Sequence, residues 1–239
     1  MLTVYCIPGM GVDHRLFRNI NLTNCVLKPI KWETPTKNEL LPDYAMRLAK
    51  QINTSEPFAL LGVSFGGMCV TEIAKRLNPL KAIVISSCKE HKELPLKLTI
   101  WKYLPLYKTL NDDTYKRSAM IVKKQFGVYT DEQALKFREM LDTSPTNYFK
   151  GAVHCIMTWK NKTIPDHLVH IHGTADRVID VGKISADYLI QDGSHFMVIN
   201  KADEINKIIN SELKDLVNLF FCGILTSHQY ILNDVGSHS

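Results

Sequence analysis

The sequence predicts an α/β fold in which helices cover both faces of a mostly parallel β-sheet. Short apolar runs alternate with longer helical patterns, as expected when helical crossovers join neighbouring strands. The run Ala82–Ile85 is apolar at consecutive positions, which is typical of a strand buried on both faces. The length of 239 residues suits one domain with an inserted subdomain. We therefore expect a single domain over residues 1–239.

Six segments are predicted as strands of this sheet, because each is a short apolar run that ends at a turn signal. Proline cannot donate a ladder hydrogen bond, so Pro29 predicts an edge or irregular position for the second strand. The predicted strands are Leu2–Ile7, Cys25–Trp32, Phe58–Val63, Ala82–Ser86, Leu168–His172 and Ala186–Ile190.

Three segments between or after these strands are predicted as helices. The first, Tyr44–Asn53, carries apolar residues every fourth position, on one face. The second, Gly67–Leu77, is stopped by Asn78 and the proline that follows it. The third is Ala202–Leu213. Residues 219–239 begin with an apolar run too short to span a bilayer, and this tail either docks on the core or extends from it.

Residues 88–160 interrupt the strand–helix alternation. The segment is aromatic and charged, is punctuated by prolines and shows no clear strand. A long connection between parallel strands is usually functional, so we expect a helical cap inserted over one edge of the sheet. Its larger apolar residues either line a pocket or pack the cap against the sheet. They are Trp101, Tyr103, Leu106, Tyr107, Phe126, Phe149 and Trp159.

The composition is that of an ordinary globular protein, with 45% hydrophobic and 22% charged residues. The net charge of +5 comes from scattered lysines and arginines without a basic block, so no nucleic-acid partner is expected. The N-terminus lacks the pattern of a signal peptide, and no apolar run is long enough for a membrane span. The six cysteines occur singly, which favours a reducing compartment. We expect a cytoplasmic protein; its oligomeric state is not indicated.

The clearest chemical signal is GVSFGG at positions 62–67, between a predicted strand and a predicted helix. This is the G-x-S-x-G pattern of a nucleophile elbow, in which a serine occupies a strained tight turn. Glycines flank such a serine because a neighbouring Cβ would collide with the strand or the helix. The pattern alone is common, but its place between strand and helix predicts Ser64 as a nucleophile.

Four motifs together resemble the α/β-hydrolase superfamily, in the family's order of oxyanion loop, nucleophile, acid and base. They are IPGMG at 7–11, GVSFGG at 62–67, IHGTADR at 171–177 and GSHF at 193–196. The resemblance covers roughly residues 2–213 and implies a parallel sheet with an inserted helical cap.

By this resemblance, Ser64, Asp176 and His195 form a catalytic triad. A histidine can accept the serine proton and return it to the leaving group, while the aspartate holds the histidine tautomer. The oxyanion hole is implied to be the backbone N–H groups of Met10 and Phe65. Pro8 stands where many relatives have a histidine that buttresses this loop. The short interval between Asp176 and His195 predicts a reduced or absent helix between them.

No metal or cofactor is expected, since His170 and His172 form an isolated pair and neither a GxGxxG motif nor a P-loop is present. The two histidines are expected to be buried or edge residues. The expected partner is a small-molecule acyl substrate, and the expected activity is cleavage of a small carboxylic ester through an acyl-enzyme. A thioesterase, a C–C hydrolase or a proton-abstracting lyase like those of menaquinone synthesis would use the same triad. A non-catalytic ligand-binding module is the alternative of another class.

Overall fold

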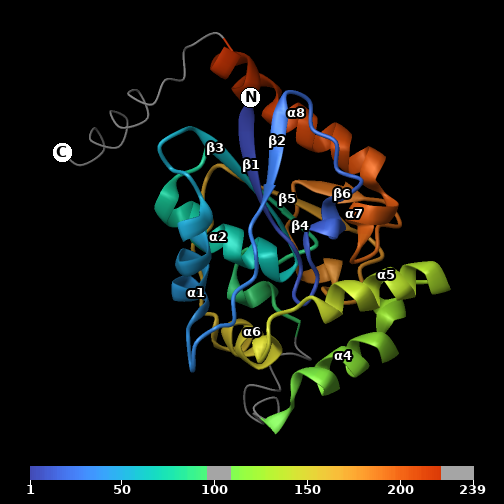
Figure 1. The fold of residues 1–239 in the computed structure, drawn as a ribbon. Coiled ribbons are helices and arrows are strands. Elements are labelled where there is room, and N and C mark those ends of the chain that lie inside the picture. The colour runs from blue at the N-terminus through green and yellow to red at the C-terminus, as the bar shows by residue number, and fades with distance from the viewer. Residues whose placement is uncertain (96–108, 222–239) are drawn as a thin grey trace.

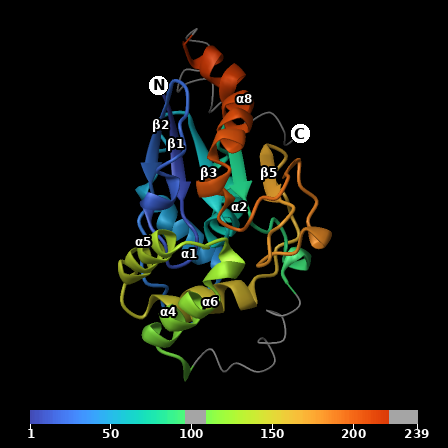
Figure 2. The same cartoon turned by 90° about the vertical axis from the view of Figure 1, so that its right-hand side faces the viewer.

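The computed structural model describes residues 1–95 and 109–221, and these residues form a parallel β-sheet between layers of helices (Figures 1 and 2). The sheet has six strands in the order β2-β1-β3-β4-β5-β6, and every neighbouring pair is parallel. The strands are β1 (Leu2–Ile7), β2 (Cys25–Pro29), β3 (Phe58–Val63), β4 (Lys81–Ile85), β5 (Leu168–Gly173) and β6 (Tyr188–Ile190). The sheet class predicted from the sequence is confirmed.

The strand order reverses at β1, which pairs with β2 on one side and β3 on the other. Open α/β sheets bind ligands outside the carboxyl ends of the strands at such a switch point. Ile7, the last residue of β1, pairs with Gly62 near the end of β3. The turn after β1 therefore lies beside the turn that carries Ser64.

Helices cover both faces of the sheet. α1 (Leu41–Leu48) and α2 (Phe65–Leu77) pack together on one face, and α8 (Ala202–Phe221) lies on the other (Figures 1 and 2). α8 is tied to the sheet through Glu212, which accepts hydrogen bonds from Lys81 Nζ at 3.0 Å and Tyr188 Oη at 2.6 Å. The strands are consequently buried on both sides, as their apolar sequences require.

The connection between β4 and β5 contains three longer helices, α4 (Asp112–Ile121), α5 (Asp131–Asp142) and α6 (Tyr148–Thr158). They lie below the carboxyl ends of the strands in Figures 1 and 2. α5 begins with a capping box between Thr130 and Gln133, which satisfies N–H groups that a helix start leaves free. The short elements are α7 (Met197–Asn200) and the 3-10 helices η1 (His14–Phe17), η2 (Ala49–Gln51), η3 (His91–Glu93), η5 (Lys123–Phe126) and η6 (Val181–Lys183).

Four strands differ from the predicted bounds: β4 by one residue at each end, β5 by one residue at its end, and β2 and β6 by more. β2 is an edge strand, as Pro29 predicted, but it ends there rather than at Trp32. Trp32 instead turns its indole toward Val12. β6 begins at Tyr188 rather than Ala186, since the Asp187 carboxylate accepts from the His170 N–H at 2.7 Å.

Three helices also differ in their bounds. α1 begins at Leu41, with a proline in its first turn, and its end tightens into the 3-10 helix Ala49–Gln51. α2 begins at Phe65 rather than Gly67. α8 continues to Phe221 rather than ending at Leu213, because its apolar face continues: Val217 is 5% exposed. Residues 219–221, predicted to start a tail, thus belong to the last helix.

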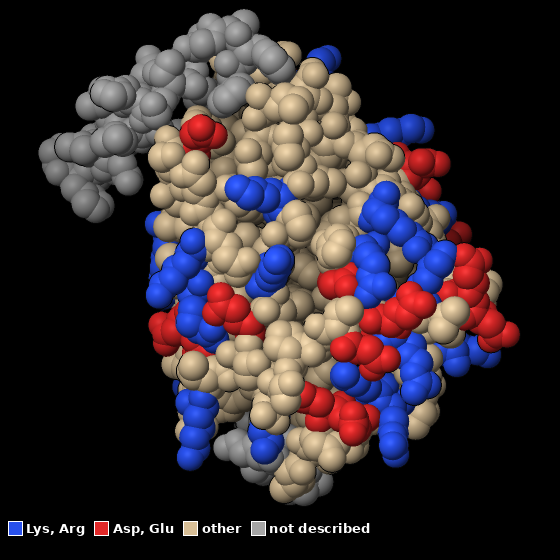
Figure 3. Space-filling model, in the orientation of Figure 1, with Lys and Arg blue, Asp and Glu red and all other residues tan. Residues whose placement is uncertain are grey.

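The surface of the molecule carries charges of both signs. On the face shown in Figure 3, basic and acidic side chains lie next to one another over much of the lower half. Within residues 1–95 and 109–221, no helix combines the length and the apolar character needed to cross a membrane.

Candidate active site

Ser64 lies in a strained turn between β3 and α2. Its backbone has φ 54° and ψ −122°, a conformation that costs energy in a non-glycine residue. A Cβ on Gly62 would lie 2.6 Å from the Gly66 carbonyl oxygen, and a Cβ on Gly66 would lie 2.2 Å from the carbonyl oxygen of Ile7. Both flanking glycines are thus required sterically, one by the start of α2 and the other by the end of β1.

Hydrogen bonds from β4 and the residues after it hold this turn in place. The Ser64 N–H donates to the carbonyl of Ile85 at 3.0 Å, and Ser87 Oγ donates to the Ser64 carbonyl at 2.6 Å. These two bonds hold the N–H and the carbonyl of Ser64 in place. The Ser64 side chain is left free to point toward His195.

His195 lies between Ser64 and Asp176. Its Nε2 is 2.9 Å from Ser64 Oγ, and its Nδ1 is 2.8 Å from Asp176 Oδ2. The imidazole is 1% exposed and packs beside the ring of Phe126, with 5.7 Å between ring centroids. The three residues predicted as nucleophile, base and acid are therefore brought together, in the order that a Ser-His-Asp relay uses.

Asp176 is held on the loop after β5 by backbone donors. Its Oδ1 accepts from the N–H groups of Val178 at 2.8 Å and Ile179 at 2.9 Å, which leaves Oδ2 for His195. Burial by itself raises the pKa of this carboxyl. The charge and hydrogen bond of His195, the Ile179 N–H and His172 together outweigh burial, and the pKa of Asp176 lies below its ordinary value. Asp176 is thus an anion at neutral pH, able to stabilise an imidazolium.

The predicted oxyanion donors lie on two segments beside Ser64. Phe65 is the first residue of α2, where a backbone N–H has no acceptor within the helix. Met10 lies in a turn closed by the Val12 N–H, which donates to the Gly9 carbonyl at 3.2 Å. Met10, Phe65 and Ser64 line the same cavity, so a carbonyl oxygen in that cavity can approach both segments.

The cavity above Ser64 has a volume of about 240 Å³ and an apolar lining. Its walls come from the strand ends and from α4, α5 and α6. Apart from Ser64 and His195, the described lining residues include one tyrosine and no Lys, Arg, Asp or Glu. Neutral, apolar groups match such a lining, because a buried charge without a partner is costly.

The pocket-lining candidates divide into three groups. Phe126 and Phe149 line the cavity. Trp159 does not: it is 2% exposed and its indole N–H donates to the buried carboxylate of Glu72 on α2 at 2.7 Å, so it packs α6 against the sheet's helices. Trp101, Tyr103, Leu106 and Tyr107 lie outside the described residues.

His170 and His172 are both buried in β5, as expected for the histidine pair. The Nε2 of His172 donates to the Ile179 carbonyl at 3.1 Å, and this bond supports the loop that holds Asp176. Neither ring nitrogen of His170 has a hydrogen-bond partner among the described residues. Over the same residues, no group of three or more His, Cys, Asp or Glu side chains is arranged to hold a metal ion.

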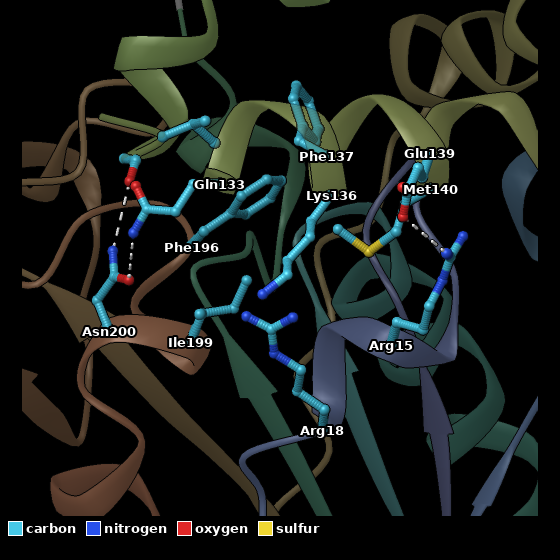
Figure 4. Close-up of a pocket in the computed structure, with 12 residues that line it drawn as sticks. Arg15, Arg18, Gln133, Lys136, Phe137, Glu139, Met140, Phe196, Ile199 and Asn200 are labelled. Atoms are coloured by element: carbon cyan, nitrogen blue, oxygen red, sulfur yellow. Dashed lines mark hydrogen bonds and ion pairs between the residues drawn. The ribbon is translucent and has the colours of Figure 1, made fainter. Parts of the chain in front are cut away.

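A smaller hollow of about 50 Å³ adjoins the cavity, since Phe137 lines both. Figure 4 shows the side chains that surround it, several of them cationic. Two of these cations are already paired within the chain, Arg15 with Asp13 at 2.8 Å and Lys136 with Glu132. The described residues that line this hollow include no serine, cysteine or histidine, so the cavity above Ser64 is the candidate active site.

Sequence reasoning missed two features of the site. The backbone donors of Val178 and Ile179 depend on the loop's conformation rather than on residue type. Trp32, which contacts both oxyanion segments, stands in a stretch that was interpreted as a strand. An aromatic residue just beyond the proline of an edge strand was the available clue.

Neither the protein-family models nor the curated proteins include a match to this sequence. Solved structures are similar over most of the chain. An esterase from Thermogutta terrifontis is 12% identical with a TM-score of 0.62, covering 90% of each chain. A lipase-esterase related protein from Clostridium acetobutylicum is 18% identical with a TM-score of 0.61, over 87% of this chain and 93% of that one.

A third similar structure is the RedJ thioesterase of prodiginine biosynthesis in Streptomyces coelicolor. It is 16% identical with a TM-score of 0.61, over 89% of this chain and 85% of that one. At these identities the likeness concerns the fold, which hosts several chemistries. The chain has the α/β-hydrolase fold, as its four motifs predicted.

Proposed function

We propose that this protein is a serine hydrolase that cleaves a small, uncharged carboxylic ester through an acyl-enzyme. The observation that carries the proposal is the placement of His195, hydrogen-bonded to Ser64 Oγ and to Asp176 Oδ2 at the base of an apolar cavity. A ligand-binding module with this fold needs neither a strained serine nor a buried aspartate behind the histidine. The hydrolases among similar structures support the same class of reaction.

The proposed reaction has two halves. His195 Nε2 takes the Ser64 proton as Oγ attacks the ester carbonyl, and the carbonyl oxygen becomes an anion held by the Met10 and Phe65 N–H groups. The C–O bond to the alcohol then breaks, and the imidazolium returns the proton to the leaving alkoxide. In the second half, water gives its proton to His195 and attacks the acyl-enzyme. The carboxylic acid is released and Ser64 regains its proton.

The apolar lining of the cavity favours a neutral substrate among the alternatives that share this triad. A substrate carrying carboxylates, such as an acidic substrate of a proton-abstracting lyase, would place charges against Met68, Leu141 and Ile156 without a cationic partner among the described lining residues. An acyl group without charge meets no such penalty. Thioester hydrolysis remains the second candidate, since a thioesterase is among the similar structures and its acyl group would occupy the same apolar space.

Covalent capture of Ser64 by a fluorophosphonate tests the proposal. His195 would remove the Ser64 proton and the oxyanion donors would stabilise the charged adduct, so the wild-type protein should be labelled on the peptide containing residues 62–67. Ser64→Ala and His195→Ala should abolish labelling. Ser118→Ala is the matched control: Ser118 is exposed on α4, and its loss should leave labelling unchanged.

Absence of labelling in folded wild-type protein would refute the hydrolase proposal and favour the binding module. Labelling that persists in Ser64→Ala would mean that another residue is the nucleophile.

Once Ser64 is shown to be the nucleophile, the accepted acyl and leaving groups are identified by comparing substrates. These are neutral 4-nitrophenyl esters, their thioester counterparts and an ester carrying a free carboxylate. We expect the carboxylate ester to be cleaved at least about 100-fold more slowly than its neutral counterpart, because its charge would be buried unpaired.

A further inference from the structure

The loop that carries Met10 has a proline at position 8, and a proline side chain cannot form a hydrogen bond. Two hydrogen bonds from side chains elsewhere in the chain reach the backbone of this loop. Trp32 Nε1 donates to the Val12 carbonyl at 2.9 Å, and Ser144 Oγ donates to the Gly11 carbonyl at 3.3 Å. The first bond comes from the segment after β2 and the second from the segment between α5 and α6.

The bond from Trp32 acts on the turn that sets the direction of the Met10 N–H. Val12 closes this turn by donating to the Gly9 carbonyl, and Gly11 within it has φ +74°. The Gly9 carbonyl and the Met10 N–H belong to one planar peptide, so the bond that closes the turn also fixes the direction of that N–H. With the Trp32 bond, both the N–H and the carbonyl of Val12 are hydrogen-bonded. The end of the turn is therefore less able to move.

The same tryptophan also contacts the second oxyanion segment. Its ring stacks on Phe65 with centroids 5.4 Å apart and planes at 21°. Tyr44 contacts both rings, at 6.3 Å from Trp32 and 6.1 Å from Phe65. Tyr148 lies 5.5 Å from the Trp32 ring. Phe65 is 2% exposed, so its position at the start of α2 is fixed by these rings.

Trp32 does not line the substrate cavity, yet it joins the two backbone segments whose N–H groups would hold the oxyanion. We propose that Trp32 is a positioning residue for the oxyanion hole: its indole N–H holds the Met10 turn while its ring holds Phe65, so that the two donors converge. This inference rests on the proposed function. Stabilisation of an oxyanion depends on donors placed within a few tenths of an ångström.

Trp32→Phe tests the inference, because it keeps an aromatic ring but removes the indole donor. Two quantities are measured: hydrolysis of 4-nitrophenyl butyrate, and inhibition by an alkyl trifluoromethyl ketone, which adds to the serine to form a tetrahedral oxyanion. We expect kcat/KM and the affinity for the ketone to fall together, by about 10- to 100-fold, with KM within about 2-fold of wild type. The pH dependence of kcat should be unchanged, since Trp32 does not contact His195.

Trp159→Phe is the matched control. It also removes one indole hydrogen bond from a tryptophan outside the cavity, but here the bond is to Glu72 rather than to the turn that carries Met10. It should lower stability and leave kcat/KM and ketone affinity near wild type. If Trp32→Phe does not fold, benzothienylalanine at position 32 keeps the indole shape without the donor and is expected to give the same losses.

Three results would overturn the inference. The first is a Trp32→Phe variant that loses no more activity than Trp159→Phe. The second is a loss of kcat without weaker ketone inhibition, which would place the effect outside the oxyanion hole. The third is a wild-type protein that neither reacts with fluorophosphonate nor binds the ketone, which would refute the proposed function itself.

Discussion

Asp176 and His195 are 19 residues apart in sequence, and their side chains meet in a hydrogen bond of 2.8 Å. The chain between them forms only the 3-10 helix Val181–Lys183 and the strand β6. This agrees with the sequence prediction of a reduced connection. The short path is possible because both residues follow strands that are neighbours in the sheet, β5 and β6.

Asp176→Asn should keep the fold and reduce kcat by about 10⁴-fold. Oδ1 of this residue accepts from the N–H groups of Val178 and Ile179, so the oxygen of an asparagine would stay there and its NH₂ would face His195. The amide would then donate to Nδ1 and force the proton onto Nε2. In that tautomer the ring cannot accept the Ser64 proton.

The rate is measured with a neutral 4-nitrophenyl ester and the fold by circular dichroism. Asp180→Asn is the control, because Asp180 is an exposed aspartate of the same loop that caps the 3-10 helix Val181–Lys183. It should have nearly wild-type activity. A near-normal kcat for Asp176→Asn would mean that the acid lies elsewhere.

The parts of the site that sequence could predict are those defined by local turns. The glycines around Ser64 are required by contacts with β1 and α2, and such requirements leave a motif in the sequence. Asp176 and His195 were identified by the resemblance of their motifs to a known family, and both lie within five residues of a strand end. The sheet class follows from apolar runs.

The parts that could not be predicted depend on contacts between distant segments. Trp159 and Phe126 look alike in sequence as large residues of the insertion, but one binds Glu72 on α2 and the other lines the cavity. The packing of the inserted helices against the rest of the fold decides between these roles, and no local sequence pattern determines that packing. The C-terminal end of α8 was missed because the apolar run around Leu219 was interpreted apart from the helix before it.

The stability of the protein should fall as the pH is lowered below about 6.5, the usual pKa of histidine. Burial, followed by the nearby His172 and Lys89, holds the pKa of His170 well below this value, and Asp176 opposes them only in part. The unfolded chain therefore takes up a proton that folded His170 refuses. The resulting loss is at most about 1.4 kcal/mol per pH unit for one group, and it ends where the folded pKa is reached.

His170→Phe should reduce the slope of the unfolding free energy against pH by the contribution of this one histidine. The slope is measured by urea unfolding between pH 7.5 and 5.5. Burial of His167 and His172 also lowers their pKa values. Part of the pH dependence of stability will therefore remain in this variant. His14→Phe is the control, since His14 is exposed. An unchanged slope in His170→Phe would show that the folded protein accommodates a charge at His170.

Truncation within α8 should separate the part of the helix that supports the core from the residues after it. A chain ending at Leu213 loses Val217, which is 5% exposed, and the partly buried Leu216, and should lose about 2 kcal/mol or more of unfolding free energy. A chain ending at Phe221 should match the full chain in activity, because Ser64 and the other proposed catalytic residues precede it. Equal stability of the two truncated chains would contradict a core role for Val217.

The inserted helices should determine which acyl groups are accepted, and Val153 on α6 offers a test. It lines the cavity and is half-buried, so Val153→Phe should fill part of the 240 Å³ without touching the triad. We expect kcat/KM for 4-nitrophenyl octanoate to fall by about 10-fold or more, while that for the acetate stays near wild type. Shape discrimination by a single apolar side chain is commonly of this size.

Leu135→Phe supplies the control for this comparison. It makes a similar enlargement on another helix of the insertion, α5, where the side chain is 60% exposed, and the ratio of octanoate to acetate rates should not change. If Val153→Phe lowers both rates equally, the added ring disturbs the shared machinery. If neither rate changes, acyl chains occupy a different region from the cavity wall formed by α6, and the assignment of substrate selection to the inserted helices is wrong.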